Sequence, residues 1–126
     1  MHVADLMRGG DAVPRVGTET VMNEMLHEMT RKGLGFTAVC DAAGQVAGIF
    51  TDGDLRRLIE TGADLRALRA SDVMSASPKL VRDDALAVAA AELMERHRVT
   101  GRLVVDDAGQ LVGAINSNDL MRAKVI

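Results

Sequence analysis

The chain has 126 residues, 48% of them hydrophobic and 26% charged, so it is a globular protein long enough for one compact domain. Its net charge is −3 and it contains two Phe but no Trp or Tyr, which argues against a nucleic-acid partner because the basic excess and aromatic stacking platforms are missing. The sequence contains no apolar run of transmembrane length and only one cysteine, Cys40, and we expect no signal peptide. We expect a cytoplasmic protein with no membrane partner, in which Cys40 is a buried strand residue.

The first half of the chain predicts a short amphipathic opening over residues 3–8, then a strand, a helix, a hairpin and a second helix. Thr18 or Thr20 is the expected cap of the first helix. The apolar face of this helix recurs at i, i+3, i+4 and i+7 and consists of Met22, Met25, Leu26 and Met29. The hairpin strands are expected at 36–40 and 46–50, joined by a turn in which Gly44 supplies the positive φ. A helix then runs from residues 51–54 to Gly62.

The second half repeats this order. An entry strand is expected at 78–81, a helix capped by Asp83 or Asp84, a hairpin with strands 102–105 and 111–115, and a last helix that begins at 116–119. The apolar helix face is predicted to be Leu86, Ala89, Ala90, Leu93 and Met94. A constant offset of 65 residues relates the two hairpins, while the opening residues 3–7 return as 70–74 at an offset of 67.

Neither repeat is large enough to bury a core alone, so the pattern predicts a paired α/β (α+β) fold of two β-α-β-β-α units, residues 1–66 and 67–126. We expect the two units to pack sheet to sheet around a pseudo-twofold axis, with ligand clefts between the halves.

The clearest candidate site is Thr51-x-x-Asp54, at a strand-to-helix junction. As a purely structural feature it is a capping box, in which each side chain satisfies a free N–H of the first helical turn. The same place also suits a ligand, because a helix N-terminus attracts anions and a carboxylate one turn in can accept two hydrogen bonds from a ribose diol. The pattern recurs after the second hairpin as Asn116-Ser-Asn-Asp119.

Over its whole length the chain resembles a CBS-domain pair, or Bateman module, because each repeat has an opening Asp-x-Met, an amphipathic helix, a hairpin and a Gly-x-x-Thr-x-x-Asp-Leu pattern, with Asn in the place of Thr in the second repeat. More narrowly, the segments 49–57, 72–74 and 119–126 resemble the C-terminal CBS pair of bacterial arabinose-5-phosphate isomerases, which carry a sugar-isomerase (SIS) domain upstream. This resemblance implies a regulatory fragment that is not itself an enzyme, requires no cofactor and forms a homodimer through its helices.

The resemblance also implies a nucleotide-type ligand, with Asp54 and Asp119 holding ribose hydroxyls and Thr51 beside the first of them. The second copy departs from the family pattern because Asn116 replaces the hydroxyl residue, so its cleft is expected to hold another ligand or another pose. Adenine nucleotides are the family's usual ligands. Pathway logic favours the late product CMP-Kdo, a nucleotide sugar of lipopolysaccharide biosynthesis, as a feedback effector.

Geometry nominates further wall residues around the two turns. They are Arg15, Gly33, Leu34, Gly35 and Asp52 in the first half, and Lys79, Arg98, Val99, Thr100 and Ser117 in the second. The three cations are candidates for phosphate contacts, and the alternative for each is a solvated charge or, for Arg98, a helix-terminal cation. His27 is expected in solvent and His97 at a helix end. No residues have the spacing of a zinc site.

Two rival functions remain open at this stage. One is a structural module that drives oligomerisation, in which both turns serve only as caps and the methionine stripe of the first helix is core or an interface. The other is a stand-alone enzyme acting on a nucleotide, which the absence of any nucleophile with its base argues against. The parent protein is also open, since other proteins carry CBS pairs.

Overall fold

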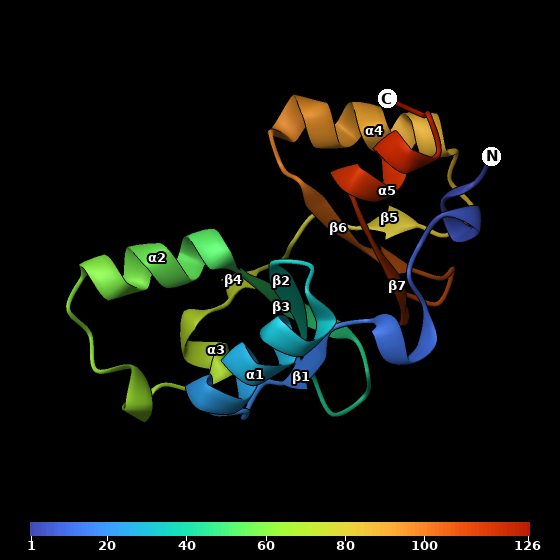
Figure 1. Ribbon diagram of the computed structural model, residues 1–126. Coiled ribbons are helices and arrows are strands. Elements are labelled where there is room, and N and C mark those ends of the chain that lie inside the picture. Colours follow the sequence, from blue (N-terminus) through green and yellow to red (C-terminus); the bar gives the residue numbers. More distant parts are fainter. The chain divides into compact units, whose positions relative to one another are not determined.

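A computed structural model describes residues 1–126, which form two compact units. The central unit comprises Pro14–Pro78, and the terminal unit comprises Met1–Val13 together with Lys79–Ile126 (Figure 1). The strand-helix-hairpin-helix body of each sequence repeat lies within one unit. The opening segment of the first repeat belongs to the terminal unit and that of the second repeat to the central unit, so the compact units do not coincide with the repeats at 1–66 and 67–126.

The central unit is built on a four-stranded sheet of order β1-β2-β3-β4. Its elements are β1 (Arg15–Gly17), α1 (Met22–Lys32), β2 (Phe36–Cys40), β3 (Val46–Thr51), α2 (Asp52–Glu60), η3 (Leu65–Ala67), α3 (Ala70–Val73) and β4 (Ser75–Ala76). β1 pairs parallel to β2, whereas the β2–β3 hairpin and the β3–β4 pair are antiparallel. Gly44 closes the hairpin with φ = 82°, as the sequence predicted.

The terminal unit repeats this plan with a three-stranded sheet of order β5-β6-β7. Its elements are η1 (Val3–Asp5), η2 (Gly10–Ala12), β5 (Val81–Arg82), α4 (Ala87–His97), β6 (Gly101–Val105), β7 (Leu111–Asn116) and α5 (Ser117–Arg122). Figure 1 shows α4 and α5 together beside this sheet. The tandem β-α-β-β-α fold is therefore confirmed, while the packing of one sheet on the other and the pseudo-twofold axis stay predictions.

Each unit has its own apolar core, and corresponding positions fill it. In the central unit Met22, Met25 and Met29 of α1 are at most 5% exposed and pack with strand and α3 residues, so the methionine stripe is core rather than an interface. In the terminal unit the equivalent face of α4 is Ala87, Ala90, Ala91 and Met94. Leu86, predicted to belong to this face, is 51% exposed because it precedes the helix.

The predicted helix caps were wrong for α1 and α4. Their N-cap residues are Val21 and Leu86, and neither helix has a side-chain capping bond. The hydroxyl of Thr20 instead accepts the N–H of Gly17 at 3.0 Å, and the carboxylate of Asp84 accepts Arg82 at 3.0 Å. Thr20 and Asp84 thus bond to the strands that precede them, and these local side-chain bonds compete with helix capping.

The opening segments explain the Asp-x-Met pattern. Asp5 and Asp72 each accept the N–H three residues earlier, at 2.8 Å in both cases, and so order the first turn of η1 and α3. The methionine that follows lies over a hairpin glycine: Met74 over Gly48, and Met7 over Gly113. A Cβ at Gly48 would lie 2.5 Å from the Met74 sulfur, so the glycine is required by close approach rather than by its φ angle.

Glu28 on α1 is a buried carboxylate, although it does not belong to the predicted apolar face of this helix. It is 9% exposed and accepts the N–H of Arg15 at 3.0 Å, Lys32 at 2.7 Å and Arg31 at 2.9 Å. Burial raises the pKa of this carboxyl, but the Lys32 hydrogen bond, the Arg15 N–H and the two positive charges outweigh it, so the pKa is lowered. Glu28 therefore joins the end of α1 to the edge strand β1. At the equivalent position α4 carries Leu93.

No helix of the structure is long and apolar enough to cross a membrane.

Candidate functional site

The turn between β3 and α2 is a complete capping box. The hydroxyl of Thr51 accepts the N–H of Asp54 at 3.1 Å, and the carboxylate of Asp54 accepts the N–H of Thr51 at 3.0 Å. These reciprocal bonds satisfy two of the free N–H groups at the helix start. The structural role foreseen from the sequence is therefore confirmed, and it holds Asp54 Oδ2 in a fixed position.

The other carboxylate oxygen of Asp54 is held only loosely. Oδ1 accepts Arg57 Nη2 at 2.7 Å, and the Arg57 side chain is 66% exposed, whereas that of Asp54 is 18% exposed. An ion pair of this exposure contributes about 0–1 kcal/mol, so a ligand hydroxyl can displace the guanidinium at small cost. Asp54 thus combines one fixed oxygen with one that is available for exchange.

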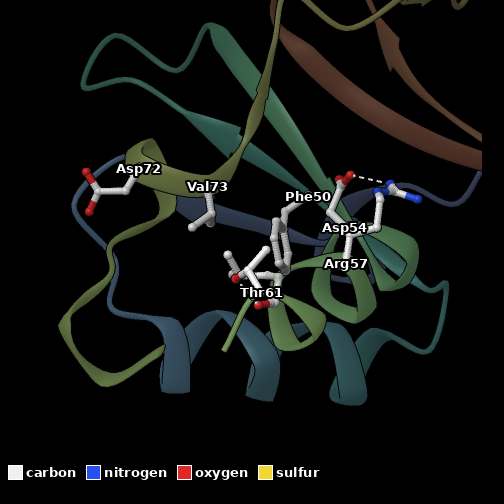
Figure 2. Close-up of a pocket in the computed structure, with 7 residues that line it drawn as sticks. Phe50, Asp54, Arg57, Thr61, Asp72 and Val73 are labelled. Atoms are coloured by element: carbon white, nitrogen blue, oxygen red, sulfur yellow. Dashed lines mark hydrogen bonds and ion pairs between the residues drawn. The ribbon is translucent and has the colours of Figure 1, made fainter. Parts of the chain in front are cut away.

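Asp54 opens on a cavity of about 290 Å³, near the lower end of the volumes of small-molecule sites. Seven residues line it: Phe50, Asp54, Arg57, Leu58, Thr61, Asp72 and Val73. Figure 2 shows the Asp54–Arg57 pair at one side of this cavity, and Val73 of α3 pointing toward Phe50 and Thr61. The cavity therefore has an apolar floor and a charged rim, and one wall belongs to the opening segment of the second repeat.

Three of the predicted wall residues meet at a different cavity, which lies between α1 and α2. Gly33, Gly35 and Asp52 line about 420 Å³ there, together with Leu26, Met29, Thr30 and Leu55. The N–H of Asp52 donates to the carbonyl of Gly35 at 2.9 Å, so these residues do flank the Thr51 turn as the sequence suggested. Asp52 and Asp54 nevertheless line different cavities, because residues two positions apart in an α-helix lie on different faces of it.

The corresponding turn of the terminal unit has the same capping box but a different environment. The side chain of Asn116 accepts the N–H of Asp119 at 2.9 Å, and Asp119 Oδ2 accepts the N–H of Asn116 at 3.0 Å. Asp119 Oδ1 also accepts Arg122 at 2.9 Å and Arg8 at 3.2 Å, and its side chain is 9% exposed. The asparagine is thus an adequate cap, and the carboxylate of Asp119 is already saturated by two guanidinium groups.

The other predicted wall residues are spread over the two units. The N–H of Arg15 binds Glu28 and its exposed side chain lines neither cavity, and Leu34 is buried at 8% exposure. Arg98 ends α4 in the left-handed region at φ = 53°, where the equivalent residue of the central unit is Gly33 at 71°. Val99 is 39% exposed. The carbonyl of Thr100 accepts the N–H of Ser117 at 2.9 Å, so Thr100 flanks the Asn116 turn.

Of the remaining candidates for chemistry, Cys40 is buried in β2, and burial raises the pKa of its thiol, as expected for an unreactive core residue. His27 is exposed, as predicted. His97 lies in the last turn of α4, where desolvation and the charges of Lys79, Arg102 and Arg96 lower its pKa. Lys79 Nζ is 3.5 Å from His97 Nε2.

Sequence reasoning missed most of the residues around Asp54. Arg57, Thr61 and Val73 were not nominated, although Val73 is the central residue of the Asp-x-Met pattern that revealed the second repeat. Arg8 was also missed, yet a signal for it existed: at the offset of 67 residues its counterpart is Ser75, so the two opening segments differ there in charge.

The two units share one plan, a strand, a helix, a hairpin and a second helix that begins with a capping box. This plan defines the class of tandem β-α-β-β-α repeat proteins. The model of the CBS domain matches residues 3–61 and 70–126, and the chain belongs to the CBS domain family.

Among curated relatives, the chain is 44% identical to arabinose 5-phosphate isomerase KdsD of Pseudomonas aeruginosa over 126 residues, which is 100% of this chain and 39% of the relative. It therefore spans about two fifths of that relative's length. Among solved structures, Arabidopsis thaliana CBSX2 in complex with AMP has a TM-score of 0.82 at 25% identity, covering 98% of this chain and 96% of that one. CBS domain protein PAE2072 of Pyrobaculum aerophilum, complexed with AMP, has a TM-score of 0.85 at 22% identity, with coverages of 95% and 90%.

Proposed function

We propose that this chain is the regulatory CBS pair of an arabinose-5-phosphate isomerase and that it senses a nucleotide or nucleotide sugar. The observation that carries the proposal is the 44% identity to KdsD over every residue of the chain, joined to a capping-box carboxylate that opens on a cavity. In this proposal catalysis belongs to an upstream SIS domain, and the chain acts as a cytoplasmic sensor that dimerises through its helices. AMP complexes of two CBS proteins of the same fold support a nucleotide ligand.

The chemistry of the Asp54 turn fits a ribose. One oxygen of Asp54 stays on the N–H of Thr51, and the other exchanges Arg57 for a hydroxyl of the ligand. The released guanidinium of Arg57 then lies beside the ligand and is free to pair with a phosphate. The base would occupy the apolar part of the cavity, against Phe50 and Val73.

The regulatory step would be a population shift. The wall formed by Asp72 and Val73 belongs to α3, which packs with α1 and the hairpin through Ala70. A ligand that closes the cavity favours one position of α3 and of β4, and so biases the link between the two repeats. Coupling of this kind is worth about 1–3 kcal/mol, which is a change of roughly 5- to 150-fold in affinity.

CMP-Kdo is our choice of effector over an adenine nucleotide. It is a late product of the pathway that arabinose 5-phosphate enters, and it offers a ribose diol to Asp54 together with a phosphate and a carboxylate for nearby cations. Isothermal titration calorimetry and thermal unfolding with AMP, ATP, CMP and CMP-Kdo would test this. We expect CMP-Kdo alone to give strong, selective binding, and a preference for AMP or ATP would point instead to an energy-state sensor.

The variant Asp54→Asn tests the site itself. Asparagine can still accept the N–H of Thr51, so the cap is largely retained, but it lacks the charge that a diol requires. We expect affinity to fall by roughly 10- to 100-fold, on the basis of about 1.5–3 kcal/mol for a charged hydrogen bond. The matched control is Asp64→Asn, an exposed carboxylate on a helical cap away from the cavity. Equal affinity of both variants would remove Asp54 from the site.

The alternative function is a structural oligomerisation module without a ligand. It is favoured by the completeness of both capping boxes, which need no ligand to be satisfied, and by the exposed apolar residues Ile59, Val88 and Met121 on three helices. In that case none of the nucleotides raises the melting temperature, because only a native-state binder stabilises by mass action.

A further inference from the structure

One buried cation in the terminal unit has no counterpart in the central unit and no adequate partner. Arg102 of β6 is 5% exposed, and its Nε and Nη2 atoms are buried without a hydrogen-bond partner. The equivalent residue of the central unit is Thr37, whose hydroxyl bonds to the carbonyl of Ala38 at 3.1 Å. A buried guanidinium with two orphaned donors is costly, so it calls for a partner from outside the chain.

The orientation of Arg102 is specific. Nη1 donates to the carbonyl of Lys79 at 2.7 Å, which anchors the guanidinium to the residues that precede β5. The two orphaned atoms, Nε and Nη2, lie along one edge of the planar group, and this is the pair that binds an oxyanion in a two-pronged, side-on manner. Arg102 is therefore anchored through one nitrogen while its anion-binding edge is unused.

The surroundings of Arg102 are positively charged as well. His97 Nε2 is 3.5 Å from Lys79 Nζ, and Lys79, Arg102 and Arg96 all act electrostatically on His97. None of these cations forms an ion pair with a carboxylate. In the central unit the carboxylate of Glu28 meets the cations at the end of α1, and the residue at its place in α4 is Leu93. The end of α4 in the terminal unit thus has several cations that pair with no carboxylate, whereas the end of α1 in the central unit has Glu28.

We propose that Arg102, Lys79 and His97 form an oxyanion site of the terminal unit that binds a phosphate group, either free or as a monoester on a small molecule. Lys79 is exposed, His97 is half-buried and Arg102 is buried, and Arg102 is bonded to the carbonyl of Lys79. The phosphate supplies the negative charge that Leu93 cannot. Because Nε and Nη2 of Arg102 are buried, binding requires the groups that cover them to move, and the phosphate then accepts these two orphaned N–H groups. The site does not depend on Asp54, so it stands or falls separately from the proposed nucleotide site of the central unit.

The first experiment measures thermal unfolding in sodium phosphate and in sodium chloride at matched ionic strength. We expect millimolar inorganic phosphate to raise the melting temperature by roughly 2–5 °C more than chloride does. His97 gives a second readout by NMR, because a bound phosphate favours the protonated ring and raises its pKa. No phosphate-specific stabilisation together with an unchanged His97 titration would overturn the proposal.

Arg102→Met assigns the site to this residue. Methionine fills similar space without orphaned donors, so in chloride the variant should melt at or above the temperature of the wild type, while its response to phosphate is lost. The control is Arg66→Met, which removes a 91% exposed guanidinium and should retain the full phosphate response. A phosphate response that persists in Arg102→Met would overturn the assignment.

Lys79→Ala provides a second test in case Arg102→Met does not fold. Lys79 is exposed, so removal of its side chain should leave the fold intact. We expect it to weaken phosphate binding by roughly tenfold or less, as suits one exposed cation. Asp54→Asn should leave the response to inorganic phosphate unchanged, which separates this site from the proposed nucleotide site. Ribose 5-phosphate, titrated into Asp54→Asn alongside inorganic phosphate, then separates the two sources: tighter binding of the ester indicates a small-molecule ligand, and equal binding indicates free phosphate.

Discussion

Gly48 offers the sharpest test of how the opening segments pack. A methyl group at this position would lie 2.5 Å from Sδ and 2.8 Å from Cγ of Met74, and 2.8 Å from the carbonyl oxygen of Ser75. Comfortable contacts between such atoms are about 3.5–4.0 Å. The methionine can rotate away, but the Ser75 carbonyl is main chain of β4, which pairs with β3 beside the glycine. Gly48→Ala must therefore displace β4 and α3 by several tenths of an ångström.

The energetic cost follows from this geometry. Overpacking of this kind costs about 1–3 kcal/mol, and the entropy gained by replacing glycine returns about 0.4–1 kcal/mol. We expect a net loss of about 1–2 kcal/mol. For a chain of this size each kcal/mol corresponds to roughly 3–6 °C in melting temperature. Because α3 carries the Val73 wall of the cavity, the same variant should also weaken nucleotide binding.

Urea denaturation of Gly48→Ala and of the control Gly53→Ala measures this cost. Gly53 lies within α2, and the nearest neighbour of an added Cβ would be the exposed Arg57 guanidinium at 3.4 Å, so alanine there should stabilise by about 0.5–1 kcal/mol. Unfolding midpoints in the opposite order, with unchanged m-values, would refute the close-approach argument. A double-mutant cycle with Met74→Ala separates the side-chain clash from the main-chain clash, and we expect a coupling of at least about 0.5 kcal/mol.

Three further predictions concern single residues. Glu28→Gln should cost about 1–3 kcal/mol at neutral pH, because it removes the negative charge of the partly buried, hydrogen-bonded Glu28–Lys32 ion pair. The lowered pKa of Glu28 in the folded state means that its contribution is present above the unfolded value near 4.5 and is lost as the pH falls through the folded value, so wild type and variant should converge in acid unfolding curves. Arg8→Ser, which copies the equivalent Ser75, should lower stability by about 1 kcal/mol or less in low salt and by less in high salt, since Arg8 is 34% exposed; an equal effect at both ionic strengths would contradict the ion pair with Asp119. Cys40 should react with thiol reagents at least roughly 100-fold more slowly in buffer than in urea, and similar rates would mean that the strand opens readily.

The parts of the fold that the sequence predicted are those set by local periodicity. The hairpin strand 36–40 agrees with β2 residue for residue, and the methionine face of α1 is the core face. Helix starts were less predictable, because Thr20 and Asp84 bond to their own strands rather than to the helices that follow. The compact units also differ from the repeats, because the repeat pattern does not indicate which unit each opening segment packs against.

The candidate site was predictable only at its motif. Thr51 and Asp54 stand out because the pattern recurs, whereas Arg57 of α2 and the C-cap residue Thr61 line the cavity only because the fold brings them near α3 residues. The burial of Glu28 was missed because three donors from α1 and β1 must converge on it, which a polar residue on a helix face does not reveal. The sequence pattern therefore does not predict contacts between segments that are distant in the sequence.

The two repeats share a backbone plan and have diverged in charge. In the central unit Asp54 keeps one oxygen on an exposed, exchangeable arginine, and Glu28 neutralises the cations at the end of α1. In the terminal unit Arg8 and Arg122 saturate Asp119, while Arg102 is buried without an anion. A carboxylate with one exchangeable partner favours hydroxyl groups, and a guanidinium without an anion favours a phosphate. The chain therefore has the features of two unlike sites, and a ligand that satisfied both units equally would contradict the chemistry of their side chains.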